Sequence, residues 1–149
     1  MSLSGVAVNP ECVTTYEETK SQTGELAFAI YKIVDGEFVV HHSFPRSELL
    51  TDETSFDKFH KYLTDNLKTP FYASLVVKSN RVKEGRIVEK MIFITYIPEN
   101  HCSIKEKMLY SSSKDALKKA VSSFNIEIHA NDEDALEPEE VQDRVEKAK

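Results

Sequence analysis

The sequence predicts an α/β protein of the α+β type, with a central mixed, mostly antiparallel sheet of five to six strands flanked by helices on both faces. Strand patterns come in pairs along the chain, which is typical of antiparallel neighbours. The longest helical pattern, residues 103–121, precedes the last strand pattern, so one parallel crossover is expected there. The segment 26–34, LAFAIYKIV, is apolar on both faces for most of its length, which indicates a central strand covered on both sides.

Length and composition are those of one ordinary globular domain. The chain has 149 residues, 40% of them hydrophobic and 30% charged, so we expect a single domain over 1–149 with its core at about residues 4–147. The net charge of −6 argues against general binding of nucleic acid, which needs a basic surface. No apolar run reaches the roughly 18 residues of a membrane helix, and the N-terminus lacks the pattern of a signal peptide. We therefore expect an intracellular protein with no stable membrane insertion and two free cysteines, Cys12 and Cys102.

The N-terminal segment begins with small residues. Residues 2–8 are expected to form a short mobile arm. A helix begins at Asn9-Pro10, because Asn is a good N-cap and Pro is favoured at the first helical position. Val13 and Tyr16 are expected to point from this helix to the core.

A hairpin follows, with strands at 26–34 and 37–44. Asp35-Gly36 is a two-residue hairpin signal, because a type I′ turn needs positive φ at both central positions. His41 and His42 are adjacent in the second strand, so their side chains point to opposite faces and do not share a metal.

The middle of the chain predicts a helix and a second, longer hairpin. The helix covers residues 54–67, with Thr54 and Asp57 as a capping box, and the strands are 71–77 and 91–97. Between the strands lies the polar, basic segment 78–90, KSNRVKEGRIVEK, which we interpret as the projecting tip of the hairpin. This tip is either a solvated loop or a binding site for an acidic partner.

The C-terminal third predicts a long helix, a strand and a last helix. The strand covers 125–130, where Ile126 and Ile128 alternate with polar residues, and an acidic turn leads to a helix that begins at Pro138. The apolar stripe of the last helix is formed by Val141, Val145 and Ala148.

The long helix, residues 103–121, has two unlike faces. One side can pack on the sheet and is formed by Leu109, Ser113, Ala116, Leu117, Ala120 and Val121. Ile104 and Met108 fall on the other side, among lysines. Either the helix bends near Tyr110 and buries these two apolar side chains, or they meet a partner.

Catalytic motifs are absent from the sequence. It contains no Gly-rich phosphate loop, no GxSxG elbow and no HExxH pair. The alternative of a small enzyme that uses a surface thiol such as Cys102 stays open on the sequence alone. A binding module fits better, because the small-residue arm, the basic hairpin tip, the lysine-ringed helix and the charged last helix would all suit an acidic cytoskeletal surface.

Several segments resemble the actin-depolymerising factor (ADF)/cofilin family. They are SGVAV at 4–8, IFITYIP at 92–98, KEKMLYSSSKDALKKAV at 105–121, EIHANDEDAL at 127–136 and VQDRVEK at 141–147. The resemblance covers essentially the whole chain. It implies the ADF-homology fold and a protein that binds actin monomers (G-actin) and filaments (F-actin), prefers ADP-actin, severs filaments and speeds subunit loss. It also implies a monomer without cofactor, metal or catalytic turnover, located in the cytoplasm on the actin cytoskeleton and also in the nucleus.

The resemblance also implies which residues contact actin. The long helix enters a cleft between two actin subdomains, with Lys105 and Lys107 before Met108 as the main contact. The monomer and filament site consists of Ser4, Gly5, Val6, Ile104, Lys105, Lys107, Met108 and Lys114. Ser4 is the implied regulatory phosphorylation site, since a phosphate there would oppose docking on acidic actin.

A second, filament-only surface is implied at the hairpin and the last helix, with Arg86, Lys90, Asp143, Arg144 and Lys147. The hairpin departs from the family, because the positions of a basic pair in relatives are occupied here by Val88 and Lys90, so one charge is missing. Arg86 is the alternative, which would replace that charge with a shift in register. Tyr72-Ala73 is followed by SLVVKS instead of an acidic, aromatic segment, and the usual tryptophan is absent near Tyr96. These departures favour monomer binding over strong filament severing.

Two further expectations follow from the resemblance. Phosphoinositide head groups would compete for Lys105, Lys107, Lys114, Lys118 and Lys119. The alternative within the same family is a protein like glia maturation factor, which binds the actin branch-junction complex. The sequence EGRI in the hairpin favours this alternative, whereas the SGVAV arm and the KDALKK helix favour cofilin.

Overall fold

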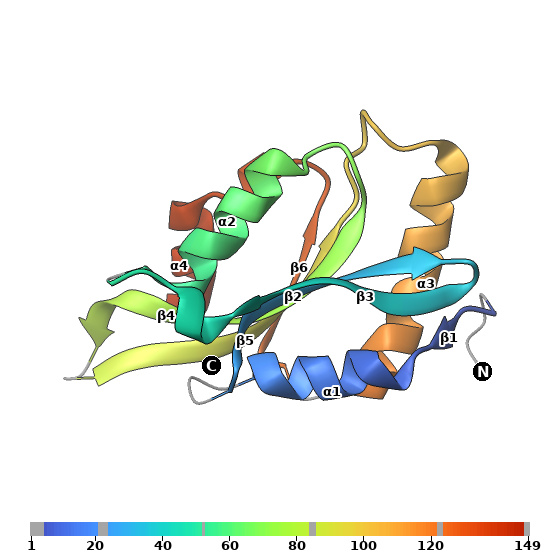
Figure 1. Ribbon diagram of the computed structural model, residues 1–149. Coiled ribbons are helices and arrows are strands. Elements are labelled where there is room, and N and C mark those ends of the chain that lie inside the picture. The colour runs from blue at the N-terminus through green and yellow to red at the C-terminus, as the bar shows by residue number, and fades with distance from the viewer. Residues whose placement is uncertain (1–4, 21–23, 52, 84–85, 122–123, 148–149) are drawn as a thin grey trace.

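The computed structural model describes residues 5–20, 24–51, 53–83, 86–121 and 124–147, with the backbone alone at 79–83 and 86–88. Figure 1 shows the order of its elements, which is β1 (Ala7–Val8), α1 (Pro10–Thr19), β2 (Leu26–Val34), β3 (Glu37–Pro45), the 3-10 helix η1 (Arg46–Glu48), α2 (Ser55–Asp65), β4 (Phe71–Lys83), β5 (Arg86–Tyr96), α3 (Ile104–Val121), β6 (Ile126–Ala130), the 3-10 helix η2 (Glu133–Leu136) and α4 (Pro138–Lys147).

The strands form one six-stranded sheet in the order β1-β3-β2-β4-β5-β6. The three central pairs are antiparallel. β5 and β6 are parallel and are joined by α3, which confirms the expected crossover. β1 and β3 form a second parallel pair that the sequence did not predict. The mixed, mostly antiparallel sheet is therefore confirmed.

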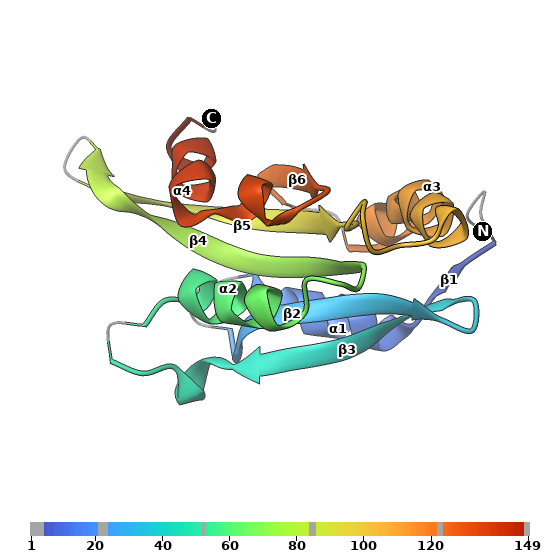
Figure 2. The same ribbon diagram turned by 90° about the horizontal axis from the view of Figure 1, so that it is seen from above.

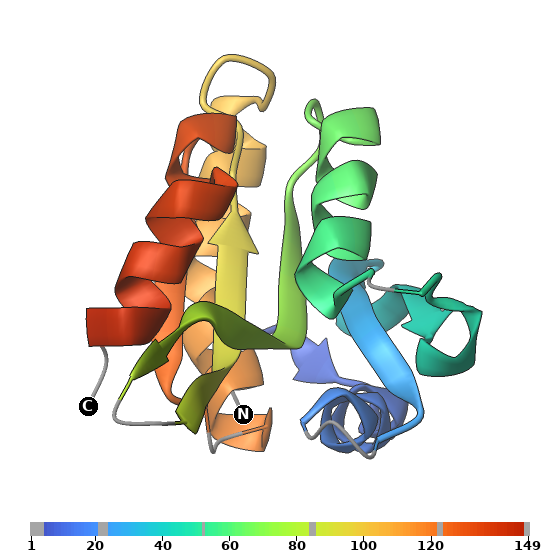
Figure 3. The ribbon, with the colours of Figure 1, turned by 90° about the vertical axis from the view of Figure 1, so that its left-hand side faces the viewer.

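Helices cover both faces of this sheet, and each face has its own apolar cluster. The cluster under α1 and α3 contains Tyr16, Tyr72, Phe93, Tyr110 and Leu117, all buried. The cluster on the opposite face packs α2 and α4 through Phe59, Leu63, Val141 and Val145. α1 and α2 accordingly lie on opposite sides of the strands in Figure 1, and Figure 3 shows α2 (green) above α1 (blue).

The helix caps and the tight turn predicted from the sequence are confirmed. Asn9 caps α1, because its side-chain oxygen accepts a hydrogen bond from the amide of Glu11 at 2.9 Å. Thr54 and Asp57 form the expected capping box of α2, with both hydrogen bonds at 3.0 Å. Asp35 and Gly36 adopt φ angles of 50° and 77°, as the tight turn between β2 and β3 requires.

Two predictions about irregular segments were wrong. The arm at 2–8 is not mobile at Val6–Val8, because β1 pairs with β3 and the side chain of Val6 is buried. The hairpin strands are longer than predicted. β4 continues to Lys83 and β5 begins at Arg86, so most of the segment expected to be a polar tip is paired strand. Figure 2 shows this hairpin extending past α4.

In α1, Cys12 and Tyr16 are buried, while Val13, which was expected to point to the core, is only half-buried.

Candidate functional site

The helix α3 begins at a capping box that sequence reading had not identified. The hydroxyl of Ser103 accepts a hydrogen bond from the amide of Glu106 at 3.1 Å, and the Glu106 carboxylate accepts one from the amide of Ser103 at 3.2 Å. This pair satisfies backbone donors at the helix start and so fixes where the first turn begins. Ile104 is therefore the first residue of α3.

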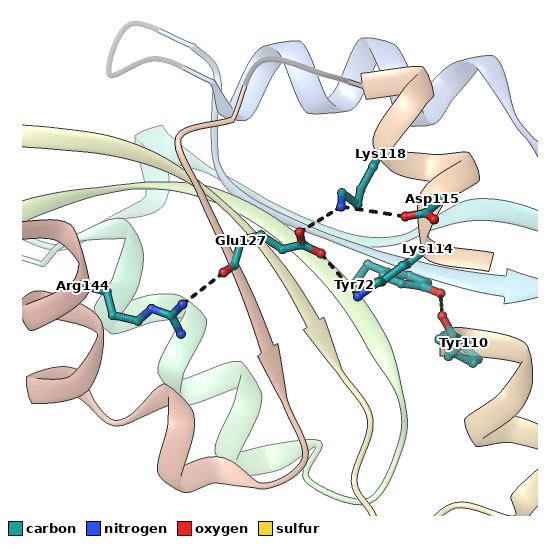
Figure 4. A network of polar contacts seen from close by, with 7 residues as sticks. All are labelled: Tyr72, Tyr110, Lys114, Asp115, Lys118, Glu127 and Arg144. Atoms are coloured by element: carbon teal, nitrogen blue, oxygen red, sulfur yellow. Dashed lines mark hydrogen bonds and ion pairs between the residues drawn. The ribbon is translucent and has the colours of Figure 1, made fainter. Parts of the chain in front are cut away.

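The inner face of α3 is held on the sheet by two tyrosines. The hydroxyl of Tyr72 donates to the backbone oxygen of Tyr110, and the two rings stack with centroids 5.3 Å apart. The amide of Ile33 donates to the Tyr110 hydroxyl at 3.1 Å. Figure 4 shows the contact of Tyr72 with Tyr110. α3 runs without interruption through Tyr110, so the alternative of a bend that buries Ile104 and Met108 is wrong.

The outer face of α3 carries an exposed apolar pair. Ile104 is 76% exposed and Met108 is 66% exposed. They lie one turn apart on the same side, with Lys105 exposed and Lys107 half-buried beside them. Neighbouring apolar side chains that stay exposed gain free energy when a partner covers them, so this pair is a candidate contact surface. The structure brings together these four predicted site residues.

The N-terminal segment lies beside this helix, as Figures 1 and 2 both show. Gly5 is exposed and has a φ of 79°, a conformation that glycine adopts without strain. The side chain of Val6 belongs to the buried cluster under α3 and is not on the surface. Ser4, the predicted phosphorylation site, lies outside the described residues.

Lys114 and Lys118 are occupied by an acidic residue on β6. Lys118 Nζ lies 2.9 Å from Glu127 Oε1, and Lys114 Nζ lies 3.6 Å from Glu127 Oε2 (Figure 4). Burial acts to raise the pKa of Glu127, but the hydrogen bond from Lys118 and the charge of Lys114 outweigh it and lower that pKa. The same hydrogen bond raises the pKa of Lys118. Sequence reading missed Glu127, because nothing local in a half-exposed strand indicates which helix faces it.

The five lysines predicted to bind phosphoinositides do not share one face of α3. Lys114 and Lys118 lie toward β6 with Glu127, whereas Lys105 and Lys119 are exposed. At 3.6 residues per turn, Lys107 falls on the same side as Lys114 and Lys118.

The predicted filament surface is only partly described. On α4, Lys147 Nζ pairs with Asp143 Oδ2 at 2.9 Å, and an Arg144 guanidinium nitrogen lies 3.4 Å from the backbone oxygen of Glu127. Lys90 is half-buried on β5, while only the backbone of Arg86 is described. The Gln142 side chain donates to the backbone oxygen of Lys78 at 2.8 Å, which ties α4 to the base of the hairpin.

Neither cysteine has the environment of a nucleophile. Burial raises the pKa of the Cys12 thiol to about 11 and raises the pKa of Cys102 as well, whereas an activated nucleophile needs a lowered pKa. These raised pKa values argue against an enzyme that uses Cys102. Within the described ranges, no three acidic, histidine or cysteine side chains are grouped to hold a metal. The described helices also include none long and apolar enough to cross a membrane.

Comparison with known proteins identifies the family and the fold. The family of cofilin/tropomyosin-type actin-binding proteins matches residues 5–146. The chain is 32% identical to the cofilin of Schizosaccharomyces pombe, with 97% of this chain and 98% of the relative covered. The ADF like UNC-60A protein of Caenorhabditis elegans has a TM-score of 0.71 at 27% identity, with 94% and 93% covered. Coactosin from Entamoeba histolytica shares the fold at 19% identity, with a TM-score of 0.77 and 97% and 96% covered. The chain therefore belongs to the family of cofilin/tropomyosin-type actin-binding proteins.

Proposed function

We propose that this protein is an actin-binding protein of the ADF/cofilin type that binds actin monomers and filaments and promotes filament severing and depolymerisation without catalytic turnover. The whole chain acts as one ADF-homology domain and as a monomer, in the cytoplasm on the actin cytoskeleton. The exposed pair Ile104 and Met108, beside Lys105 and Lys107, is the observation that carries the proposal.

The first two turns of α3 carry both the charged and the apolar side chains that such a contact needs. Lysines attract an acidic surface over a distance and raise the rate of encounter. Ile104 and Met108 lose their contact with water only when the partner covers them, and desolvated side chains at the centre of an interface carry most of its affinity. The tyrosines under the helix hold it in place, so little order has to be gained on binding.

The test compares two double substitutions that remove the same charge. Lys105→Ala with Lys107→Ala is expected to weaken monomer binding by about 10- to 100-fold, the range of interface hot spots. Lys61→Ala with Lys68→Ala is the matched control, because both residues are exposed near α2 on the other face of the sheet. Binding is measured with labelled monomers and by co-sedimentation with filaments. Equal affinities of the two variants would contradict the assignment to α3.

Filament binding involves, in this proposal, the exposed side of α4. Alanine at Asp143, Arg144 and Lys147 together is expected to reduce co-sedimentation with filaments and to leave monomer binding unchanged. A loss of both kinds of binding would show that α4 has no filament-specific role. Filament length followed over time by microscopy tests severing directly.

A binder with weak severing is the second candidate, and the departures in the hairpin favour it. Val88 stands where a basic residue is expected, so one charge of the filament surface is missing. Filaments that stay long while the protein co-sediments with them would identify this second function. Capture of the branch-junction complex in preference to actin would instead identify a protein like glia maturation factor.

Phosphoinositides compete with actin at the lysines of α3 in this proposal. Lys105, Lys107 and Lys119 form no ion pair within the described part of the chain, so they are the ones available to a lipid phosphate. Vesicles containing phosphatidylinositol bisphosphate are expected to release actin from the protein, and neutral vesicles of the same size are not.

A further inference from the structure

Three lysines line one side of α3 between its buried and its exposed faces. At 100° per residue, Lys107, Lys114 and Lys118 lie within about 40° of one another around the helix. Lys105 and Lys119, by contrast, lie on the outward side with Met108. The helix therefore carries two sets of cations, and what separates Lys107 from Lys114 and Lys118 within one set is whether an acidic side chain of the protein pairs with them.

Glu127 forms ion pairs with two of these three lysines, Lys114 and Lys118. Its neighbours Ile126 and Ile128 are buried in the α2 and α4 cluster, so alternation along β6 turns Glu127 to the α3 side of the sheet. There its two carboxylate oxygens reach different lysines, Lys118 at 2.9 Å and Lys114 at 3.6 Å (Figure 4).

This cluster is more constrained than the ordinary ion pairs of a protein surface. The side chains of Glu127, Lys114 and Lys118 are 27%, 29% and 26% exposed. Partial burial keeps salt and water from weakening the attraction as much as they do at a fully exposed pair. The backbone of Glu127 is also held from α4, where Arg144 contacts its carbonyl oxygen at 3.4 Å. The carboxylate is thus fixed in position and keeps both ammonium groups turned toward the sheet.

We propose that Glu127 is a specificity-determining residue for the partner surface of α3, which holds Lys114 and Lys118 out of the interface and confines the cationic contact to Lys105 and Lys107. This inference rests on the proposed actin binding. It removes Lys114 from the contact residues that family resemblance implies. Lys107 stays available because no acidic residue reaches it within the described chain.

Removing the Glu127 carboxylate has a consequence opposite to that of most interface substitutions. Glu127→Gln removes one negative charge and releases Lys114, whose side chain can then turn toward the exposed face, while Lys118 keeps its second ion pair with Asp115 at 3.8 Å. The association rate with an acidic actin surface is expected to rise about two- to fivefold at low salt and to return to the original value in about 0.5 M salt, because steering is screened. A purely structural role for Glu127 would lower affinity and would not give this salt dependence.

The experiment is a double-mutant cycle measured by stopped-flow binding to labelled actin monomers. In the original background, Lys114→Gln is expected to change the affinity less than twofold, whereas Lys105→Gln weakens it about tenfold or more. In the Glu127→Gln background, Lys114→Gln is expected to cancel much of the gain in association rate. Glu48→Gln is the matched control, because it makes the same change in net charge at an exposed site on η1.

The role of Glu127 and the proposed actin binding fail on different results. Lys114→Gln as damaging as Lys105→Gln, or Glu127→Gln no faster than Glu48→Gln, would overturn the role of Glu127 while actin binding stands. No binding by the unaltered protein would overturn the proposed function, and the inference with it. Urea unfolding of each variant verifies that the compared proteins are folded.

Discussion

The hydroxyl of Tyr110 accepts a hydrogen bond from the end of β2, and removing it should lower the free energy of unfolding by a measurable amount. Pairing between β2 and β4 ends at Tyr31 with Tyr72, so Ile33 lies past the last paired residue of that ladder. Its amide donates instead to the Tyr110 hydroxyl at 3.1 Å. Tyr110→Phe deletes this acceptor and keeps the ring that stacks on Tyr72 at 5.3 Å. The substitution therefore isolates one hydrogen bond at the junction of helix and sheet.

The expected loss of unfolding free energy is about 1–2 kcal/mol, because an amide left without its partner costs about 1–3 kcal/mol and this one is only partly buried. For a chain of this length that corresponds to a fall in Tm of about 2–8 °C. Urea and thermal unfolding followed by circular dichroism measure both values. The slope against urea should not change, since the ring still covers the same surface.

Tyr62→Phe is the matched control for this prediction. The hydroxyl of Tyr62 is also buried, but it has no hydrogen-bond partner within the described residues. Removing it should not destabilise the protein. If Tyr110→Phe and Tyr62→Phe gave equal stabilities, the reasoning that the Tyr110 hydroxyl caps β2 would be refuted.

Three further predictions concern the core, the thiols and the response to pH. Leu117→Ala, at a fully buried position, should cost about 2–5 kcal/mol in urea unfolding, and a loss below about 1 kcal/mol would show that α3 is not a core helix. Cys102 should react with a thiol reagent at pH 8 long before Cys12, because Cys12 is fully buried and its pKa is raised to about 11, and equal rates would contradict the packing of α1. The lowered pKa of Glu127 means that its stabilisation is present above its ordinary pKa of 4.5 and is lost as pH falls through the lower folded pKa. The stability difference between the unaltered protein and Glu127→Gln should therefore shrink below pH 4.5, and a difference that grows there would contradict the sign.

Predictions from the sequence succeeded where neighbouring residues decide the structure. The helix expected at 103–121 is observed from Ile104 to Val121, and the capping residues Asn9 and Thr54 do what their positions indicated. Hydrogen bonds within a few residues and the 3.6-residue period act before any tertiary contact forms. The exposure of Ile104 and Met108 was anticipated for the same reason, since they are apolar side chains on an otherwise polar helix face.

Contacts between distant segments could not be read in this way. The docking of β1 depends on an edge of β3 that is available only once the sheet exists. The longer strands of the β4–β5 hairpin contain polar residues that look like a loop in isolation, but pairing that starts at Phe71 with Tyr96 continues to Lys83 with Arg86, with a register shift between Lys78 and Val82. Backbone hydrogen bonds of a sheet are insensitive to side-chain polarity, so polar sequence is a poor guide to where such a ladder stops.

The sequence by itself determined the helices, the tight turn at Asp35-Gly36, the fold class and the exposed apolar pair Ile104 and Met108. Only the tertiary structure decided which cations of α3 are available, because Lys114 and Glu127 are separated along the chain and meet only when β6 packs beside β5. It also decided that Val6 belongs to the core and not to the surface. The physical reason is the same in both cases. Charge and hydrophobicity are properties of single residues, whereas their pairing and burial depend on which other segments of the folded chain lie against them.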